Sequence, residues 1–85
     1  MIVPTIHLNG TGKEDLIKQV REAHSAVCEA IDKLYGMAPH GRDYYPQGDF
    51  AYAEARTEHL ARLEPLQSVR DELMDLWQGI SEAGR

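Results

Sequence analysis

The sequence predicts an all-α protein, an antiparallel two-helix hairpin with an extended N-terminal arm. Two long stretches, residues 12–35 and 49–79, carry apolar residues at alternating spacings of three and four, as amphipathic helices do. Between them, at 36–48, glycine and proline residues interrupt the pattern. The first ten residues alternate like a strand, but no second strand pattern is present for them to pair with. We therefore predict one helical domain over residues 1–85.

The composition excludes several classes of function. A formal net charge of −5 argues against nucleic-acid binding, which normally requires a basic surface. Cys28 is the single cysteine, so no disulfide can form within the chain and a reducing compartment is expected. No stretch approaches the ~20 apolar residues of a membrane span, and the first residues lack the features of a signal peptide. We expect a cytoplasmic protein that does not contact membranes or nucleic acid.

The arm, residues 1–10, could pair with another subunit as an edge strand or lie on the helices as an extended segment, and we favour the second interpretation. Pro4 lacks the N–H that a strand ladder needs, so a central strand is excluded here. Thr11 and Glu14 form a capping-box pattern, which places the start of the first helix near Gly12. The arm therefore ends where the first helix begins.

The apolar stripe of the first helix is too broad for one partner helix. Its predicted seam consists of Leu16, Val20, Ala23, Val27, Ala30 and Leu34. The stripe is widened by Ile17, His24, Cys28, Ile31 and Tyr35. A hairpin of this size also buries little apolar surface by itself. We therefore expect two neighbours for this helix and a homo-oligomeric helical bundle, a dimer or higher.

The second helix is predicted to begin at Asp49, a favourable N-cap residue, and to end at Gly79. Its apolar residues are Ala53, Leu60, Leu63, Leu66, Val69, Leu73, Leu76 and Ile80. The step from Leu63 to Leu66 is three residues where four would continue the seam, and Pro65 lies between them. We expect a kink or a break there. Because this helix is the longer one, its C-terminal turns are expected to overhang the first helix.

The start of the first helix is a candidate anion site. Exposed backbone N–H groups at a helix N-terminus favour an anion, and the Lys13 ammonium would add a positive charge. His7, Asn9 and Thr11 stand just before it and could donate or accept hydrogen bonds. The spacing is not that of a P-loop. The alternative is a capped helix start without a ligand, which explains Thr11 by itself.

The connection between the helices is the second candidate site. Arg42 could hold a phosphate through its guanidinium group, and Tyr44 or Tyr45 could stack on a base. Gln47 adds a further hydrogen-bonding group. The alternative is a structural loop held by tyrosine packing and an Arg42–Asp43 ion pair. The residue types also suit a protein interface.

The sequence predicts neither catalysis nor a metal or other cofactor. His24 and Cys28 are four residues apart, as two metal ligands on a helix would be, but no second ligand pair is present. We interpret them as core residues. The other histidines, His7, His40 and His59, have no nucleophile at a catalytic spacing.

The two candidate sites lie at opposite ends of the first helix, roughly 33 Å apart or more. One chain cannot bring Lys13 and Arg42 to the same small ligand. An antiparallel dimer would place the loop of one subunit beside the helix start of the other. We therefore expect any ligand site to be shared between subunits.

Two motifs carry a resemblance to known proteins, Thr5-Ile6-His7-Leu8-Asn9-Gly10-Thr11 and His40-Gly41-Arg42-Asp43-Tyr44-Tyr45-Pro46-Gln47-Gly48. In these motifs and in the placement of its helices the chain resembles small phage and prophage proteins without an assigned activity. By layout alone it is similar to the helical-hairpin sponges with which phages sequester cyclic-nucleotide immune signals. That resemblance implies an oligomer that binds nucleotides between subunits in the host cytoplasm.

From these observations we expect a non-enzymatic counter-defence protein that sequesters a phosphorylated small molecule, a nucleotide in particular. Arg42 and Lys13 would hold phosphates, and a tyrosine of the loop would stack. The alternative is a protein–protein interaction module, either an inhibitor of a host defence protein or a virion accessory protein.

Overall fold

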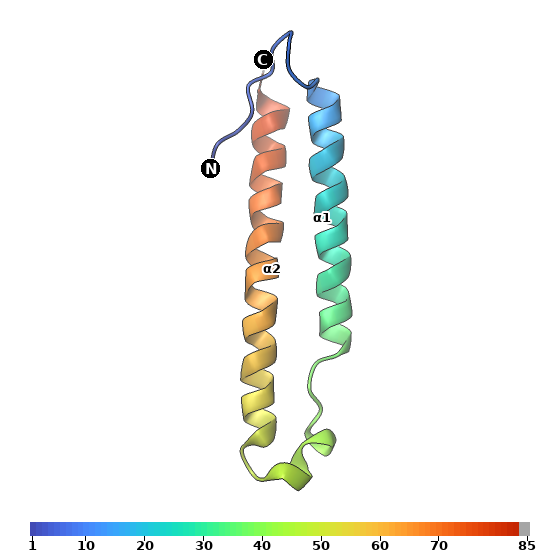
Figure 1. The fold of residues 1–85 in the computed structure, drawn as a ribbon, viewed down its shortest axis with the longest axis vertical. Coiled ribbons are helices and arrows are strands. Elements are labelled where there is room, and N and C mark those ends of the chain that lie inside the picture. Colours follow the sequence, from blue (N-terminus) through green and yellow to red (C-terminus); the bar gives the residue numbers. More distant parts are fainter. Residues whose placement is uncertain (84–85) are drawn as a thin grey trace.

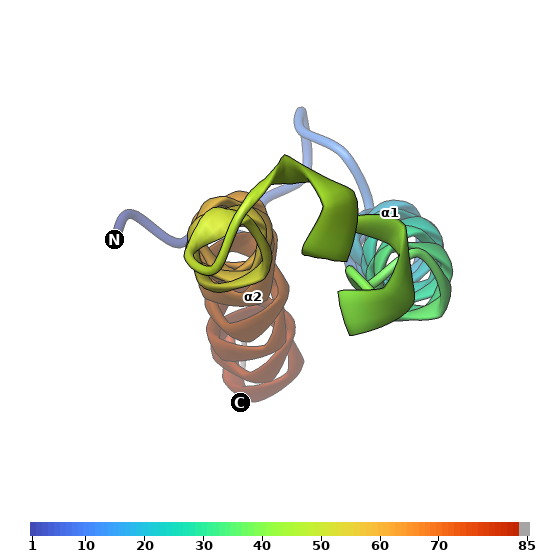
Figure 2. The same cartoon turned by 90° about the horizontal axis from the view of Figure 1, so that it is seen from below.

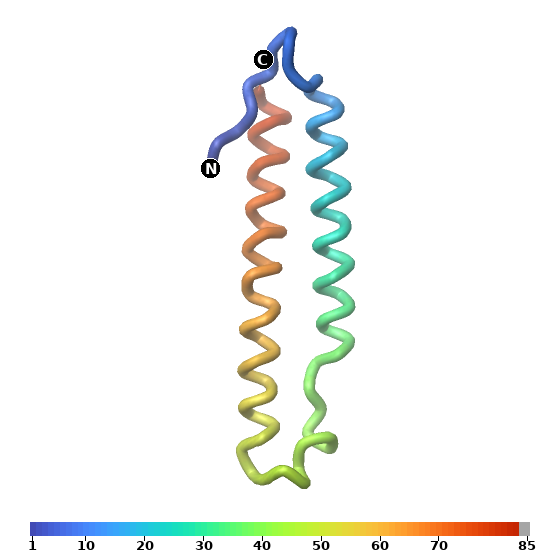
Figure 3. The backbone as a smooth tube through the Cα atoms, viewed as in Figure 1, coloured from blue at the N-terminus to red at the C-terminus, as the bar shows by residue number. Residues whose placement is uncertain are grey.

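The computed structural model describes residues 1–83. Two long helices, α1 (Lys13–Gly36) and α2 (Ala51–Glu82), lie side by side in a rod of 63 × 19 × 17 Å (Figures 1 and 3). Two short 3-10 turns, η1 (Gly41–Asp43) and η2 (Tyr45–Gln47), lie in the connection. No strand occurs within residues 1–83, so the prediction of an all-helical protein is confirmed for this part of the chain.

A regular seam holds the two helices together. On α1 the residues that are buried or half-buried at alternating steps of four and three are Lys13, Ile17, Val20, His24, Val27, Ile31 and Leu34. On α2 the corresponding residues are His59, Leu63, Leu66, Arg70, Leu73, Trp77 and Ile80. This is the spacing of knobs-into-holes packing between two helices. Four apolar side chains in the seam are buried, namely Val20, Ile31, Leu63 and Ile80.

The seam differs from the predicted one on both helices. On α1, Ala23 and Ala30 are exposed, and the seam is rotated toward His24 and Ile31. On α2, Leu60 and Val69 are exposed, while His59 and Arg70 occupy seam positions. The prediction followed apolar residues alone, so it missed these two polar members. With them included, the heptad runs through the Leu63–Leu66 step without a change of phase.

Pro65 does not divide α2. The helix is continuous from Ala51 to Glu82, with Pro65 in its interior. Pro65 is exposed, so its ring and the missing N–H lie on the side of the helix that faces water. The carbonyl that loses its helical partner there is therefore free to bond to water.

The ends of the helices also differ from the expected ones. α1 begins at Lys13, one residue after the predicted start, and its N-cap residue Gly12 has no side-chain cap, so the Thr11 capping box is not formed. α2 begins at Ala51, not at Asp49, and its N-cap residue is Phe50. At the other end α2 continues three residues beyond Gly79, to Glu82.

Gly79 serves as a contact point for the arm and does not end the helix. A Cβ atom at this position would lie 2.7 Å from Cγ2 of Val3, closer than real Cβ contacts allow. The absence of a side chain therefore lets the arm approach the α2 backbone. Figure 2 shows the arm passing over α2 at the far end of the rod. The arm thus lies on a helix, as expected.

The extra length of α2 lies at the opposite end of the hairpin from the one predicted. Lys13 at the start of α1 bonds to Ala83 just beyond α2, so the helices are level at that end. The surplus length of α2, eight residues or about 12 Å, lies at the loop end instead. There residues 37–50 run beside its first turns (Figure 1). The C-terminal turns are consequently covered, and Ile80 is fully buried.

Candidate functional site

The first predicted group, His7, Asn9, Thr11 and Lys13, lies at the end of the rod where the arm meets α1. His7 and Gly10 close a turn, in which the Gly10 N–H donates to the His7 carbonyl at 3.2 Å. A Cβ on Gly10 would lie 2.6 Å from Nε2 of His7, so the imidazole ring sits directly against this glycine. His7, Asn9 and Thr11 are exposed. Their polar groups are therefore open to a partner.

Lys13 already has a partner within the chain. Its Nζ donates a hydrogen bond of 3.0 Å to the backbone carbonyl of Ala83, and its side chain is half-buried. That carbonyl belongs to the C-terminal end of α2, where the helix dipole favours a positive charge. Lys13 therefore ties the two helix ends together. An anion at the start of α1 would have to compete with this bond.

The second predicted group lies in the connection at the opposite end. The backbone of η1 and η2 is held by successive turns: the Tyr44 N–H donates to the Gly41 carbonyl at 3.1 Å, and the Gln47 N–H donates to the Tyr44 carbonyl at 2.9 Å. Gly48, which follows η2, has φ +118°, a conformation that favours glycine. The loop therefore has a defined shape in which Tyr44 is half-buried and the Tyr45 side chain projects outward.

The polar groups of this loop are available for binding. The Arg42 side chain is exposed, and within residues 1–83 its guanidinium makes no hydrogen bond or ion pair. The Arg42–Asp43 pair of the structural alternative is therefore not formed. Tyr45 is 76% exposed, and Gln47 is exposed as well. Because the pairing is absent, loop structure alone does not account for Arg42.

The structure does not bring the two groups together within one chain. They are separated by the full length of α1, 24 residues or about 36 Å of helix. Figure 1 shows the arm and the connection at opposite ends of the rod. A small ligand can therefore contact one group or the other, but not both, unless a second subunit takes part.

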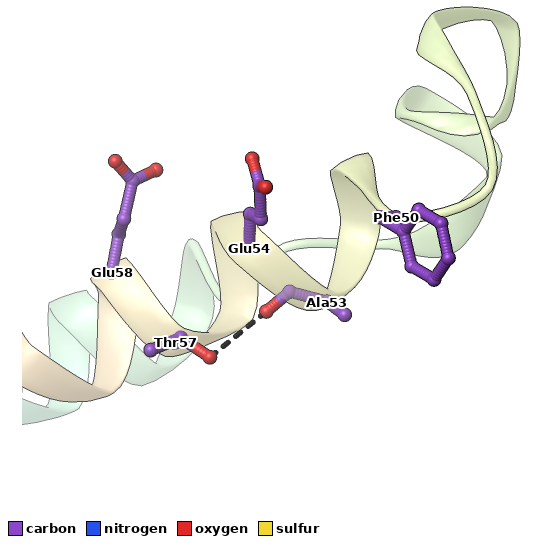
Figure 4. A pocket seen from close by; sticks show the side chains of 5 residues that line it. All are labelled: Phe50, Ala53, Glu54, Thr57 and Glu58. Carbon is purple, nitrogen blue, oxygen red and sulfur yellow. Dashed lines mark hydrogen bonds between the residues drawn. The ribbon is translucent and has the colours of Figure 1, made fainter.

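Two open hollows lie on α2, and none of the eight predicted residues lines either one. The first is lined by Phe50, Ala53, Glu54, Thr57 and Glu58. Glu54 and Glu58 project to the same side of the helix, and the Phe50 ring stands at the helix start (Figure 4). Glu58 and Arg62 are four residues apart on the helix, but they form no ion pair; the ion pair within residues 1–83 joins Arg70 and Asp71. The second hollow is lined by Met74, Asp75, Trp77 and Gln78.

His24 and Cys28 are neighbours in the helix pair. The Cys28 sulfur lies 3.7 Å from Nδ1 of His24, and the His24 ring meets Trp77 edge-on with centroids 6.2 Å apart. Within residues 1–83, no three histidine, cysteine or acidic side chains come together as metal ligands would. Both side chains are half-buried, and they pack between α1 and α2.

His59 is a buried polar residue that the apolar pattern of the sequence does not single out. It is 3% exposed, its Nε2 lies 2.8 Å from the Leu34 carbonyl, and its Nδ1 has no partner within residues 1–83. The Leu34 oxygen is an acceptor, so Nε2 carries the proton of this hydrogen bond. The imidazole therefore joins α2 to the last turn of α1. The sequence signal that could have identified His59 as a seam residue is its heptad position, four residues before Leu63.

Comparisons with protein-family models, with curated proteins and with solved structures found no match to this chain. Neither helix in residues 1–83 combines the length and the apolar character needed to cross a membrane. Function must therefore be argued from the geometry of the chain itself.

Proposed function

We propose that this chain is a non-enzymatic binding protein that holds a phosphorylated small molecule, a nucleotide in particular, at the boundary between two copies. The observation that carries the proposal is the exposed Arg42, which forms no ion pair within residues 1–83, three positions before the exposed Tyr45 in the same connection. A guanidinium group binds phosphate through two parallel hydrogen bonds, and a phenol ring offers a face for a base. The turns that shape the loop would limit the entropy lost on binding.

The proposal requires a homo-oligomer. The remaining candidate groups, on His7, Asn9 and Thr11, lie at the other end of the rod and are exposed there. An antiparallel second copy would bring them to the loop of its partner. Lys13 has the weakest case among these residues, since it is bonded to Ala83. The bend expected at Pro65 belongs to the same proposal, because it would change how α2 meets a neighbouring subunit.

The biological setting proposed here rests on resemblance. Sequestration of a nucleotide immune signal in the cytoplasm of an infected cell is the role of the phage sponges that this chain resembles in its predicted layout. Such a role needs a protein that binds the nucleotide tightly and does not convert it, and a small oligomer can meet both requirements.

A protein–protein interaction module is the second candidate. Large apolar side chains project into water at both ends: Leu8 is fully exposed at the arm end, and Phe50 is 77% exposed beside the loop. Exposed apolar and aromatic residues are frequent anchors of protein interfaces. A host protein or a virion component would then be the partner.

A thermal-shift screen against cyclic and linear nucleotides separates these candidates. A ligand at a hundredfold excess over its dissociation constant stabilises the folded state by about 2.7 kcal/mol. We expect a clear rise in Tm with one nucleotide, lost in Arg42→Ala and kept in Arg21→Ala, a matched removal of an exposed arginine from α1. No shift with any nucleotide, or an equal shift in both variants, would refute the binding site at Arg42.

A further inference from the structure

We propose that a second copy of this chain packs antiparallel on one particular face of the hairpin, with α1 against α1 of the partner. This face, called the alanine face below, consists of Leu16, Ala23, Ala30 and Met37 at the edge of α1 and Ala55, Arg62, Val69 and Leu76 on α2. The inference deepens the proposed function, because it defines the subunit boundary on which that function rests.

The accessible surface of the single chain is too large for a compact monomer. The chain exposes 6518 Å². A monomeric protein of 9.6 kDa normally exposes about 5,100 Å². The excess is about 1,400 Å², while a standard protein–protein interface buries about 800 Å² on each partner. The surplus surface is therefore sufficient for a stable dimer.

One hydrogen bond establishes which residues share each face. The Gln67 amide donates to the Tyr35 hydroxyl at 2.9 Å, so these two side chains lie on the same side of the seam. Residues seven apart share a side of a helix in a hairpin of this kind. The Tyr35 side therefore also carries Glu14, Arg21 and Cys28 of α1, and Leu60 and Met74 of α2. The alanine face is the other side.

The alanine face is the more apolar of the two. Apart from Arg62, every seam-flanking residue in it is alanine, valine, leucine or methionine. The Tyr35 side includes Glu14, Arg21 and Gln67 at the equivalent positions. Val69 is 43% exposed and Met37 is 60% exposed, so water still reaches this apolar surface. A second apolar surface is the natural cover.

The exposed edge of α1 is complementary to itself when reversed. At alternating steps of three and four it presents Leu16, Gln19, Ala23, Ala26, Ala30, Lys33 and Met37. An antiparallel copy centred on Ala26 sets small residues against small ones and large against large: Ala26 against Ala26, Ala23 against Ala30, Gln19 against Lys33, and Leu16 against Met37. Twofold symmetry requires this kind of self-match. The alanines allow helix axes to approach to the short end of the usual range of about 8–10 Å.

The same register suits α2. The Lys13–Ala83 bond sets the two helices level at that end, which places Val69 within about one residue of the level of Ala26, so antiparallel packing about Ala26 sets Val69 near its own copy. Arg62, which forms no ion pair within residues 1–83, then lies about one and a half turns along the helix axis from Glu72 of the partner subunit. The isolated cation on the alanine face thus gains an acidic neighbour.

A charge at the centre of the contact tests the inference. We expect wild-type protein to sediment at twice the 9.6 kDa chain mass. Ala26→Glu sets two carboxylates against each other, and we expect association at least about a hundredfold weaker. Ala61→Glu is the matched control, since Ala61 is also exposed but points away from the alanine face. A monomeric wild type, or equal dimers of both variants, would overturn the proposal.

Cross-linking tests the register even if the charged variant folds poorly. In a Cys28→Ser background, Ala26→Cys should form a disulfide-linked dimer on mild oxidation, since symmetry sets the two sulfurs together. Ala61→Cys should not. A dimer that gives no link at Ala26 would rule out this face and direction. Dimerisation is measured without nucleotide, so a failed ligand screen would leave this inference standing, and a nucleotide-binding monomer would overturn it.

Discussion

His59 gives the most direct test of how the hairpin is held together. The residue occupies a seam position, is 3% exposed, and donates from Nε2 to the Leu34 carbonyl at 2.8 Å. That carbonyl also accepts the Met37 N–H at 3.1 Å, so removal of the imidazole does not leave it without a donor. Replacing His59 with leucine should therefore remove one hydrogen bond and one buried, unpaired nitrogen at Nδ1 while retaining most of the packing volume.

The magnitudes favour leucine at this position. A lost hydrogen bond costs about 0.5–1.5 kcal/mol, while an unsatisfied buried polar group costs about 1–3 kcal/mol. His59→Leu should thus leave the free energy of unfolding unchanged or raise it by about 1 kcal/mol. His59→Ala also deletes the packed ring, and truncation of a large core side chain costs about 2–5 kcal/mol. We expect the alanine variant to be the less stable of the two by about 3 kcal/mol.

Urea denaturation followed by helical circular dichroism measures this difference. All three proteins should be compared at one concentration, because the stability of an oligomer depends on it. If the leucine and alanine variants lose the same stability, the bond from Nε2 is the main contribution of His59 and the packing argument is wrong. If both are as stable as wild type, the seam assigned here does not pass through this residue.

Three further substitutions test single contacts. Gly79→Ala should change the stability of the wild-type protein little, because the new methyl group displaces Val3. In a Val3→Ala background the same substitution should raise the free energy of unfolding by about 0.5–1 kcal/mol. Equal effects in both backgrounds, measured as a double-mutant cycle in urea, would mean that the arm does not rest on this glycine. Pro65→Ala should stabilise α2 by about 1–3 kcal/mol, since the ring is exposed and the backbone regains a donor, and a lowered midpoint of thermal unfolding would contradict this. Lys13→Met keeps the apolar stem of the side chain but loses the hydrogen bond to Ala83. We expect the free energy of unfolding to fall by about 1 kcal/mol and amide exchange in the last turn of α2 to become faster. Unchanged exchange there would show that the bond is not formed in solution.

The helices were predictable because their sequence signals are long and regular. Alternating apolar spacing over more than twenty residues distinguishes helix from strand, and it located α1 to within one residue at each end. The ends of α2 were less accurate. Asp49 has the composition of an N-cap residue, but the chain is still in the connection there, and α2 begins at Ala51. Gly79 resembles a helix stop, and its role depends on Val3, 76 positions earlier in the sequence.

Which side of each helix packs against the other helix could be predicted only in part. Val20, Val27 and Leu34 belong both to the expected stripe and to the observed seam. The stripe and the seam diverge at Ala23 and Ala30, which have the hydrophobicity of a core but lie in water in the single chain. A sequence pattern records every surface that a helix buries, including those buried against another subunit, and it does not separate one from the other.

The sequence suggests candidate site residues, and their arrangement in space could not be predicted from it. Arg42 and Tyr45 stand out because the connection carries more chemistry than a link between helices needs. Whether Arg42 pairs with Asp43 depends on side-chain geometry inside η1, which spacing does not determine. The bond from Lys13 to Ala83 depends on the length of the whole hairpin. The Lys13–Ala83 bond arises from tertiary structure, and the Arg42–Asp43 pair, not formed within residues 1–83, depends on local side-chain geometry, so the residue types alone signal neither outcome.

The thinness of the rod connects the proposed dimer with the proposed binding site. Within residues 1–83, this hairpin, 17–19 Å across, has no third α-helix to cover its faces, so the alanine face and the apolar residues at both ends remain in water. An antiparallel copy covers the face and brings Leu8 and His7 of one subunit toward Phe50 and Arg42 of the other. A copy in the parallel direction would also cover the face, but it would set like ends together and leave each site half-built. The direction of packing therefore decides whether the two ends of this chain can act on one ligand, and the cross-link at Ala26 measures that direction.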